Sequence, residues 1–408
     1  DEAEELLLEG DALWEQLLGE GEGEGEGAGG SLLAAFAASG LEGGEGPKLS
    51  KWQQRLRREQ EDVARRFREV ELLEAFVSRF AEKRPVAMQV MQELYEALLA
   101  AGRRASGHAK HGKEGEAEKG SKGKRKMKAD TTVRRLHTDL AQRIAKVLAK
   151  ALKKVRGAAT VQAVSRWHPA EEWATRARAV ATLAGGAKAA ALGPRAVEVG
   201  AALLHFLCSA HRAAALGPGG GGDEEGWDLA KELLLGALQD WGGKRECERW
   251  CAALLAAFAV RTPRVLLGLP WLETIRACGK PFVQRTQLAF VAGHLLRSAP
   301  AEDAGGAWAG LAAGFAELCA ELLEGTLGDA APGAAAQKQK LRREALRALK
   351  LALRTGRPRP GEAAVEALAP GGASAKRVVA VVAKVRDALP GRRGEAYQLC
   401  LHVLRSAG

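Results

Sequence analysis

From about residue 50 onward, hydrophobic residues recur at the spacing of an amphipathic helix. The apolar positions of the first stretch are Leu56, Val63, Phe67, Val70, Leu73, Val77 and Phe80. Ser50 and Gln53 fit a capping box, so we expect this helix to begin at Ser50. Pro85 should end it and can open a second helix, which carries Val90, Met91, Leu94, Leu98 and Leu99. The two stretches therefore predict a helical hairpin.

The same spacing predicts a third helix from about Thr131 to Arg156 and a series of further helices. We expect these at Trp173 to Leu183, Arg195 to His211, Trp227 to Trp241, Cys247 to Val260, Trp271 to Cys278, Arg285 to Leu296, Trp308 to Leu323, Gln337 to Arg354, Lys376 to Leu389 and Glu395 to Arg405. The valine-rich run near 377 could form a strand, but its apolar positions fit the helical period. Gly and Pro residues separate the stretches.

Composition agrees with a helical chain, because Ala, Leu, Glu, Arg and Lys are strong helix formers and abound here. Successive pairs of predicted helices recur at about forty residues, the size of a HEAT unit, although no literal repeat is found. The prediction is an all-α fold in which residues 48–408 form an irregular HEAT/armadillo-like α-solenoid.

Two segments lack the helical pattern. Residues 1–47 hold alternating Gly and Glu that cannot bury apolar surface, so we expect an acidic, flexible segment. Residues 102–130 are basic and lose all apolar periodicity, which predicts a disordered insertion between the second and third helices.

The charges of the chain are unevenly divided. Residues 1–47 contain thirteen Asp or Glu and no Lys or Arg, so a net charge of +11 overall leaves +24 for the remainder. A strongly basic body favours a polyanionic partner, and nucleic acid is the leading candidate.

Two predicted helices carry cations in a line beside their apolar faces, because residues three or four apart are neighbours on a helix. The candidate nucleic-acid contacts are Arg135, Arg143, Lys146, Lys150 and Lys153 on the third helix and Arg343, Arg347, Lys350 and Arg354 near residue 350. Since few aromatic residues accompany them, we expect contacts to the phosphate backbone and no base stacking. The alternative is a solvated face paired with acids of a neighbouring helix.

The run from Gly120 to Asp130 is the most basic part of the chain. Its candidate nuclear-localisation residues are Lys119, Lys122, Lys124, Arg125, Lys126 and Lys128. Such a run can be an import signal, a nucleic-acid contact, or neither, and the first two can coexist.

Candidate catalytic or metal chemistry is sparse. His168 with Glu171 and Glu172 has a spacing that could sit on a first helical turn, but one His with two carboxylates is a poor zinc site. The six cysteines form no CxxC pair; Cys247 and Cys251 are predicted to be small buried residues, and a reducing compartment is expected. No uninterrupted apolar run approaches the roughly eighteen residues of a membrane span. We therefore expect no enzymatic activity, cofactor, metal, small-molecule substrate or membrane partner.

Residues 65–99 resemble the C-terminal half of a nucleolar family that includes Myb-binding protein 1A and the fungal protein called DNA polymerase V. The matching positions are Phe67, Arg68, Leu72, Leu73, Glu74, Phe76, Val77, Arg84, Pro85, Val90, Leu94, Leu98 and Leu99. The basic helix at 134–156 is similar to the next element of that family, and residues 258–272 suit a later helix pair. The resemblance implies a non-enzymatic nucleolar protein linked to ribosomal DNA transcription and ribosome assembly.

The expected function is accordingly a scaffold of the nucleus and nucleolus. Its expected partners are ribosomal DNA, ribosomal RNA or pre-ribosomal particles, together with transcription or ribosome-assembly proteins. The alternative is a helical-repeat adaptor that binds proteins and no nucleic acid, in which case the basic stripes would be matched by acidic neighbours.

Overall fold

The computed structural model describes residues 51–83, 85–114, 121–185, 194–217, 225–243, 248–298, 307–327, 332–355, 373–389 and 394–407. The chain divides into two units between Arg57 and Arg58, and the packing described below lies within the second, residues 58–408. The acidic segment predicted at 1–47 lies outside the described residues.

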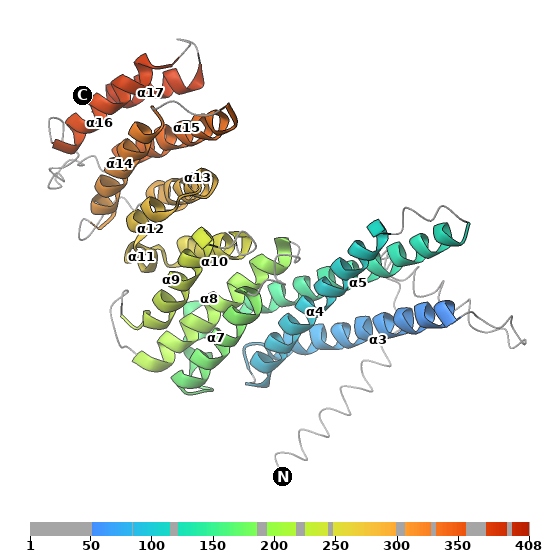
Figure 1. Cartoon of the computed structure of the whole chain (residues 1–408). Helices are drawn as coiled ribbons and strands as arrows, with labels where there is room; N and C mark the ends of the chain where they lie inside the picture. Colours follow the sequence, from blue (N-terminus) through green and yellow to red (C-terminus); the bar gives the residue numbers. More distant parts are fainter. Residues whose placement is uncertain are drawn as a thin grey trace, which may run out of the picture. The chain divides into compact units, whose positions relative to one another are not determined.

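The described residues are helical, and they include no strand, so the all-α prediction is confirmed for them (Figure 1). The α-helices are α3 (Lys51–Phe80), α4 (Val86–Glu114), α5 (Ser121–Val155), α6 (Ala158–Ser165), α7 (Ala170–Gly185), α8 (Pro194–Leu216), α9 (Asp228–Gly243), α10 (Glu248–Arg261), α11 (Pro263–Leu267), α12 (Trp271–Ala277), α13 (Pro281–Phe290), α14 (Ala307–Gly325), α15 (Pro332–Thr355), α16 (Ala373–Asp387) and α17 (Glu395–Ala407). The last turns after α13 are a π-helix, Val291–Leu295, and a 3-10 helix, Leu296–Ser298.

Helix boundaries follow the sequence signals closely. Helix α3 begins directly after Ser50, and α4 begins directly after Pro85. Pro194, Pro263, Pro281 and Pro332 are each the first residue of a helix, where the missing N–H has no intrahelical partner to lose. The valine-rich run near 377 lies in α16, which confirms a helix at this position.

The prediction of a disordered insertion at residues 102–130 differs from the structure. Helix α4 continues to Glu114 and α5 begins at Ser121, so helix replaces the expected disordered insertion on both sides of residues 115–120. Ala, Lys, Arg and Met in these segments favour helix without any apolar face to bury, and they offset Gly102, Gly107, Gly112 and Gly123, which disfavour it. Periodicity alone cannot detect a helix of this kind.

Within residues 58–408, helices pack mainly on helices near them in sequence. Helices α4 and α5 lie side by side, and α8 packs against α5, α6, α7 and α10 (Figure 1). Towards the C-terminus, α14 packs on α15 and α16, and α17 packs on α15 and α16. The buried apolar residues form one connected core that runs from Val63 to Val403. Each helix thus covers its apolar stripe with its neighbours.

Helix α8 is long and apolar, and much of it is buried. By length and composition it could cross a membrane, and 56% of its most apolar window is buried inside the molecule. A core helix passes the same test, and α8 lies at the centre of the packing between α5, α7 and α10. Its composition therefore follows from its place in the core.

Candidate nucleic-acid interface

Helix α5 is the most strongly charged helix of the predicted interface. It carries twelve Lys or Arg against two Asp, a net charge of +10. Its apolar positions, including Val133, Leu140, Ile144 and Leu148, are buried against neighbouring helices, and this burial orients the helix. The cations flank that buried stripe, as expected for an amphipathic helix.

Glu74 of α3 pairs with two of the five cations predicted on α5. Its carboxylate lies 2.6 Å from the Arg143 guanidinium and also accepts a hydrogen bond from the Lys150 ammonium. The Glu74 side chain is only 14% exposed, whereas those of Arg143 and Lys150 are 35% and 55% exposed, so the pair lies at the edge of the packed region. Burial is the largest single influence and opposes ionisation, but Lys150, Arg143 and Lys146 together outweigh it and hold the pKa of Glu74 below its ordinary value.

The other three cations of α5 are more available. Arg135 is exposed and lies 4.0 Å from Asp139, one turn along the same helix, which is a weak surface pair. Lys146 and Lys153 are exposed, and among the described residues neither makes a hydrogen bond or ion pair. Next to them, the Lys154 ammonium donates to the main-chain carbonyl of Ser78 on α3. The free cations of this face are therefore Lys146 and Lys153.

The second predicted stripe lies on α15 and is partly neutralised. Arg347 pairs with Glu344 on its own helix, at 3.3 Å, and with Glu395 at the start of α17. The hydrogen bond from Arg347 and the nearby charge of Arg343 lower the pKa of Glu395. Lys350 is half-buried, and the side chain of Arg354 lies outside the described residues. This stripe serves in part to attach α17 to α15.

The predicted localisation residues belong to the start of α5. Lys122, Lys124, Arg125, Lys126 and Lys128 lie in its first turns, with side chains outside the described residues, and Lys119 precedes the described part of the helix. Their roles as an import signal or a nucleic-acid contact remain predictions.

Arg156 and Arg261 influence one another electrostatically, although the sequence did not indicate it. Arg156 follows the end of α5, and Arg261 is the last residue of α10. Burial lowers the pKa of Arg261, and the positive charge of Arg156 lowers it further. The charge at the end of α5 is therefore felt at the last residue of α10. No sequence pattern could indicate this, because the two residues are far apart in the chain.

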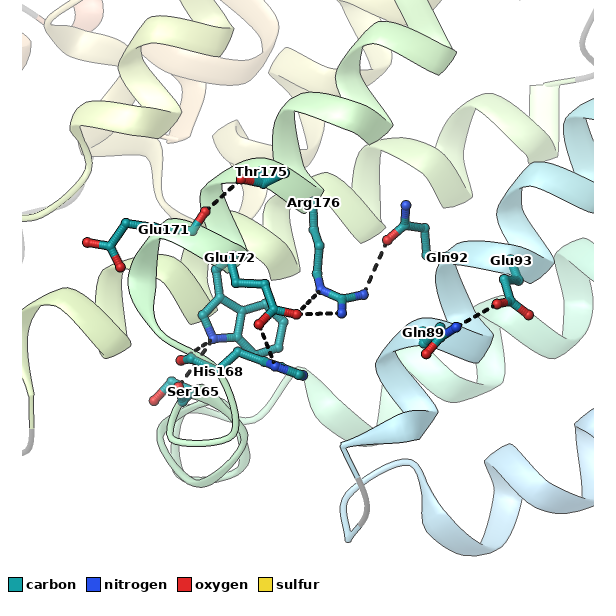
Figure 2. Close-up of polar contacts among 10 residues, drawn as sticks. Gln89, Gln92, Glu93, Ser165, His168, Glu171, Glu172, Thr175 and Arg176 are labelled. Carbon is teal, nitrogen blue, oxygen red and sulfur yellow. Dashed lines mark hydrogen bonds and ion pairs between the residues drawn. The ribbon is translucent and has the colours of Figure 1, made fainter.

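The motif around His168 forms a polar connection between helices (Figure 2). His168 Nδ1 lies 3.0 Å from the Glu172 carboxylate, which also pairs with Arg176 at 2.7 Å. Arg176 in turn donates to the Gln92 side-chain oxygen on α4, at 3.3 Å. The Arg176 hydrogen bond is the main reason that the pKa of Glu172 is lowered. The cluster thus links α7 to α4.

Metal and thiol chemistry find little support in the described part of the chain. No group of three His, Cys, Asp or Glu side chains there could hold a metal ion. The thiols of Cys208, Cys251, Cys278, Cys319 and Cys400 are buried and outside any disulfide. Burial raises the pKa of the Cys208 thiol to about 12, which keeps it protonated. Cys251 is a small buried residue as predicted, and Cys247 lies outside the described residues.

On α5, Lys146 and Lys153 present ammonium groups without a hydrogen-bond or ion-pair partner among the described residues, while Arg143 and Lys150 pair with Glu74. Comparison of the chain with models of known protein families, with curated proteins and with solved structures finds no match.

Proposed function

We propose that the protein is a non-enzymatic scaffold that binds the nucleic-acid backbone along α5 and acts in the nucleolus, in ribosomal DNA transcription and ribosome assembly. An irregular HEAT/armadillo-like α-solenoid suits this role, because each helix pair adds surface without adding a new core. The packing of helices on their sequence neighbours supports the solenoid part of the proposal. The resemblance of residues 65–99 supports the nucleolar part.

The observation that carries the nucleic-acid part is the unbalanced charge of α5. The helix has a net charge of +10, and the one carboxylate that reaches its cations from α3 is Glu74 among the described residues. Like charges on one helix face repel, and a polyanion relieves this repulsion while releasing its counterions. Binding of this kind follows the phosphates and does not read base sequence.

A protein-binding adaptor is the second candidate, and a specific observation favours it. Arg143 and Lys150 pair with Glu74, and Arg347 pairs with Glu395, so acids from neighbouring helices match three of the nine predicted contacts. If the other cations of the basic surface are paired with acids in the same way, the partners of this protein would be proteins alone.

Reversing the two free cations tests the proposal. The double substitution Lys146→Glu and Lys153→Glu is expected to weaken binding to single-stranded RNA or duplex DNA at least about tenfold and to reduce the slope of log affinity against log salt by about 2. Fluorescence anisotropy over a salt series measures both quantities. Neither lysine makes a hydrogen bond or ion pair among the described residues, and Lys146 contributes only longer-range positive charge near Glu74.

A matched control separates a local contact from the loss of net charge. Lys376 and Lys384 are exposed lysines on α16, and their reversal changes the net charge by the same amount. This control should lose affinity less than about twofold. Equal affinities of the two double variants would contradict nucleic-acid binding along α5.

Localisation in eukaryotic cells tests the nucleolar part. The tagged protein is expected to concentrate in the nucleolus, and deletion of residues 119–128 should move signal to the cytosol, because the basic run is the predicted import signal. Fluorescence microscopy alongside a nucleolar marker gives the measurement. Diffuse cytosolic signal for both proteins would contradict the nucleolar proposal.

A further inference from the structure

Helix α3 meets the α4 and α5 pair through a narrow apolar seam. Within residues 58–80 its fully buried side chains are Val63, Val70 and Val77, spaced seven residues apart, which is the spacing of a single contact line. Phe67, Leu73 and Phe76 are only partly buried beside them. A helix held along one line buries less apolar surface than a helix enclosed by several neighbours, such as α8.

The seam is also incompletely filled. A cleft of about 200 Å³ opens between α3, α4 and α5, with Val70, Leu73, Leu94, Leu140 and Ile144 among its lining residues. Arg66, Glu69 and Glu93 add polar groups to its lining. Side chains that face such a gap lack contact atoms on one side and gain less dispersion energy than in a filled core. The apolar attachment of α3 is therefore weak for its length.

Ionic contacts supply much of the remaining attachment of α3 to α4 and α5. Glu74 holds Arg143 and Lys150 of α5, and the Ser78 carbonyl accepts a hydrogen bond from Lys154 of α5. Nearer the N-terminal end of α3, Asp62 pairs with Arg104 of α4 at 3.3 Å. Salt or a competing anion weakens contacts of this kind but leaves an apolar core unaffected. The attachment of α3 thus depends on the same cations that the nucleic-acid proposal requires.

We propose that α3 is an autoinhibitory helix, whose Glu74 carboxylate occupies Arg143 and Lys150 until nucleic-acid phosphates displace it. This inference rests on the proposed binding of nucleic acid along α5. One carboxylate faces three cations, Arg143, Lys146 and Lys150, so the site keeps an excess of positive charge that attracts an incoming phosphate chain. A phosphodiester chain offers one charge per nucleotide and can satisfy all three cations at once, which a single carboxylate cannot do.

Release of α3 and binding of nucleic acid are coupled equilibria, and each is expected to favour the other. If binding requires the state in which α3 has released Arg143 and Lys150, the apparent dissociation constant is the intrinsic constant divided by the fraction of molecules in that state. A substitution that weakens the Glu74 contact raises this fraction and tightens binding. Reciprocity requires that bound nucleic acid loosen α3 in turn.

The substitution Glu74→Gln, compared with Glu71→Gln, tests the inference. Gln keeps the size of Glu but removes the charge, so Glu74→Gln should tighten binding to a fluorescein-labelled single-stranded oligoribonucleotide by about tenfold and steepen its salt slope by up to about 2, the two cations set free. Glu71 lies one turn earlier on the exposed side of α3 and makes no contact with α5 among the described residues. Its replacement should change affinity less than about twofold.

Hydrogen exchange of the unmodified protein gives an independent measurement. Addition of the oligoribonucleotide should speed exchange of the α3 amides while the buried amides of α4 keep their protection. This second measurement tests the inference even where Glu74→Gln lowers the stability of the fold.

The outcomes separate the two proposals. Binding by the unmodified protein, with equal affinities of Glu74→Gln and Glu71→Gln and unchanged exchange of α3, would overturn autoinhibition and leave nucleic-acid binding intact. Absence of binding by the unmodified protein and by both variants would overturn both proposals. Tighter binding of Glu74→Gln together with faster exchange of α3 supports both.

Discussion

Replacing Trp173 with alanine is expected to lower the free energy of unfolding by about 4 kcal/mol. The Trp173 side chain is fully buried on α7, and its ring meets Phe206 of α8 edge to face at 6.2 Å between centroids. Its indole N–H donates to the Ser165 carbonyl at 3.2 Å and to the His168 carbonyl at 3.1 Å. The substitution therefore leaves a cavity and also removes the one donor shared by the Ser165 carbonyl, at the end of α6, and the His168 carbonyl beyond it.

Urea denaturation followed by circular dichroism measures this loss, with Trp173→Phe as the matched variant. Phenylalanine keeps most of the buried ring but lacks the N–H, so we expect a loss of about 2 kcal/mol, from the smaller ring and the unpaired carbonyls. The difference between the two variants isolates the cavity. A loss below about 1 kcal/mol for Trp173→Ala would contradict the central position of Trp173 in the core.

Replacing Gly200 with alanine should cost about 3 kcal/mol, near the upper end of the range for overpacked cores. Gly200 of α8 faces Tyr95 of α4, and a Cβ atom at residue 200 would lie 2.2 Å from the Tyr95 hydroxyl oxygen and 2.6 Å from its Cζ atom. The Tyr95 side chain is fully buried, so it has no room to turn away. The clash would force α4 and α8 apart.

Two comparisons give this prediction its control. Gly236 is an exposed helical glycine with no atom within 4 Å of an added Cβ, so Gly236→Ala should stabilise the protein by about 0.5 to 1 kcal/mol through helix propensity alone. In a Tyr95→Leu background the cost of Gly200→Ala should fall sharply, because the clashing ring is gone. Additive effects of the two substitutions, measured by urea denaturation, would contradict a direct contact between residues 95 and 200.

Most helices could be predicted from the sequence because burial of one face imposes a period of 3.6 residues. The exceptions have physical reasons. Helices α6 and α11 have eight and five residues, too few for a period to be visible. The ends of α4 and α5 within residues 102–130 have no apolar period, since their helix follows from propensity.

The sequence predicted which cations lie on the candidate interface but not which of them are paired. The cations of α5 and α15 were found because they are close in sequence and lie on one helix face. Which of them are free depends on Glu74 and Glu395, and the first of these pairs with Lys150, 76 residues further along the chain. The sequence left paired and unpaired cations as alternatives; the structure shows pairing at Arg143, Lys150 and Arg347, and free ammonium groups at Lys146 and Lys153.

By itself, the sequence determined the helical class, the bounds of most helices and the excess of positive charge on α5, because these depend on residues within a few turns of one another. Only the tertiary structure decided that Glu74 pairs with two of those cations, that Gly200 makes room for Tyr95 and that the charge of Arg156 acts on Arg261. Such contacts join residues far apart in the chain, and they form only where the burial of apolar faces brings two helices together.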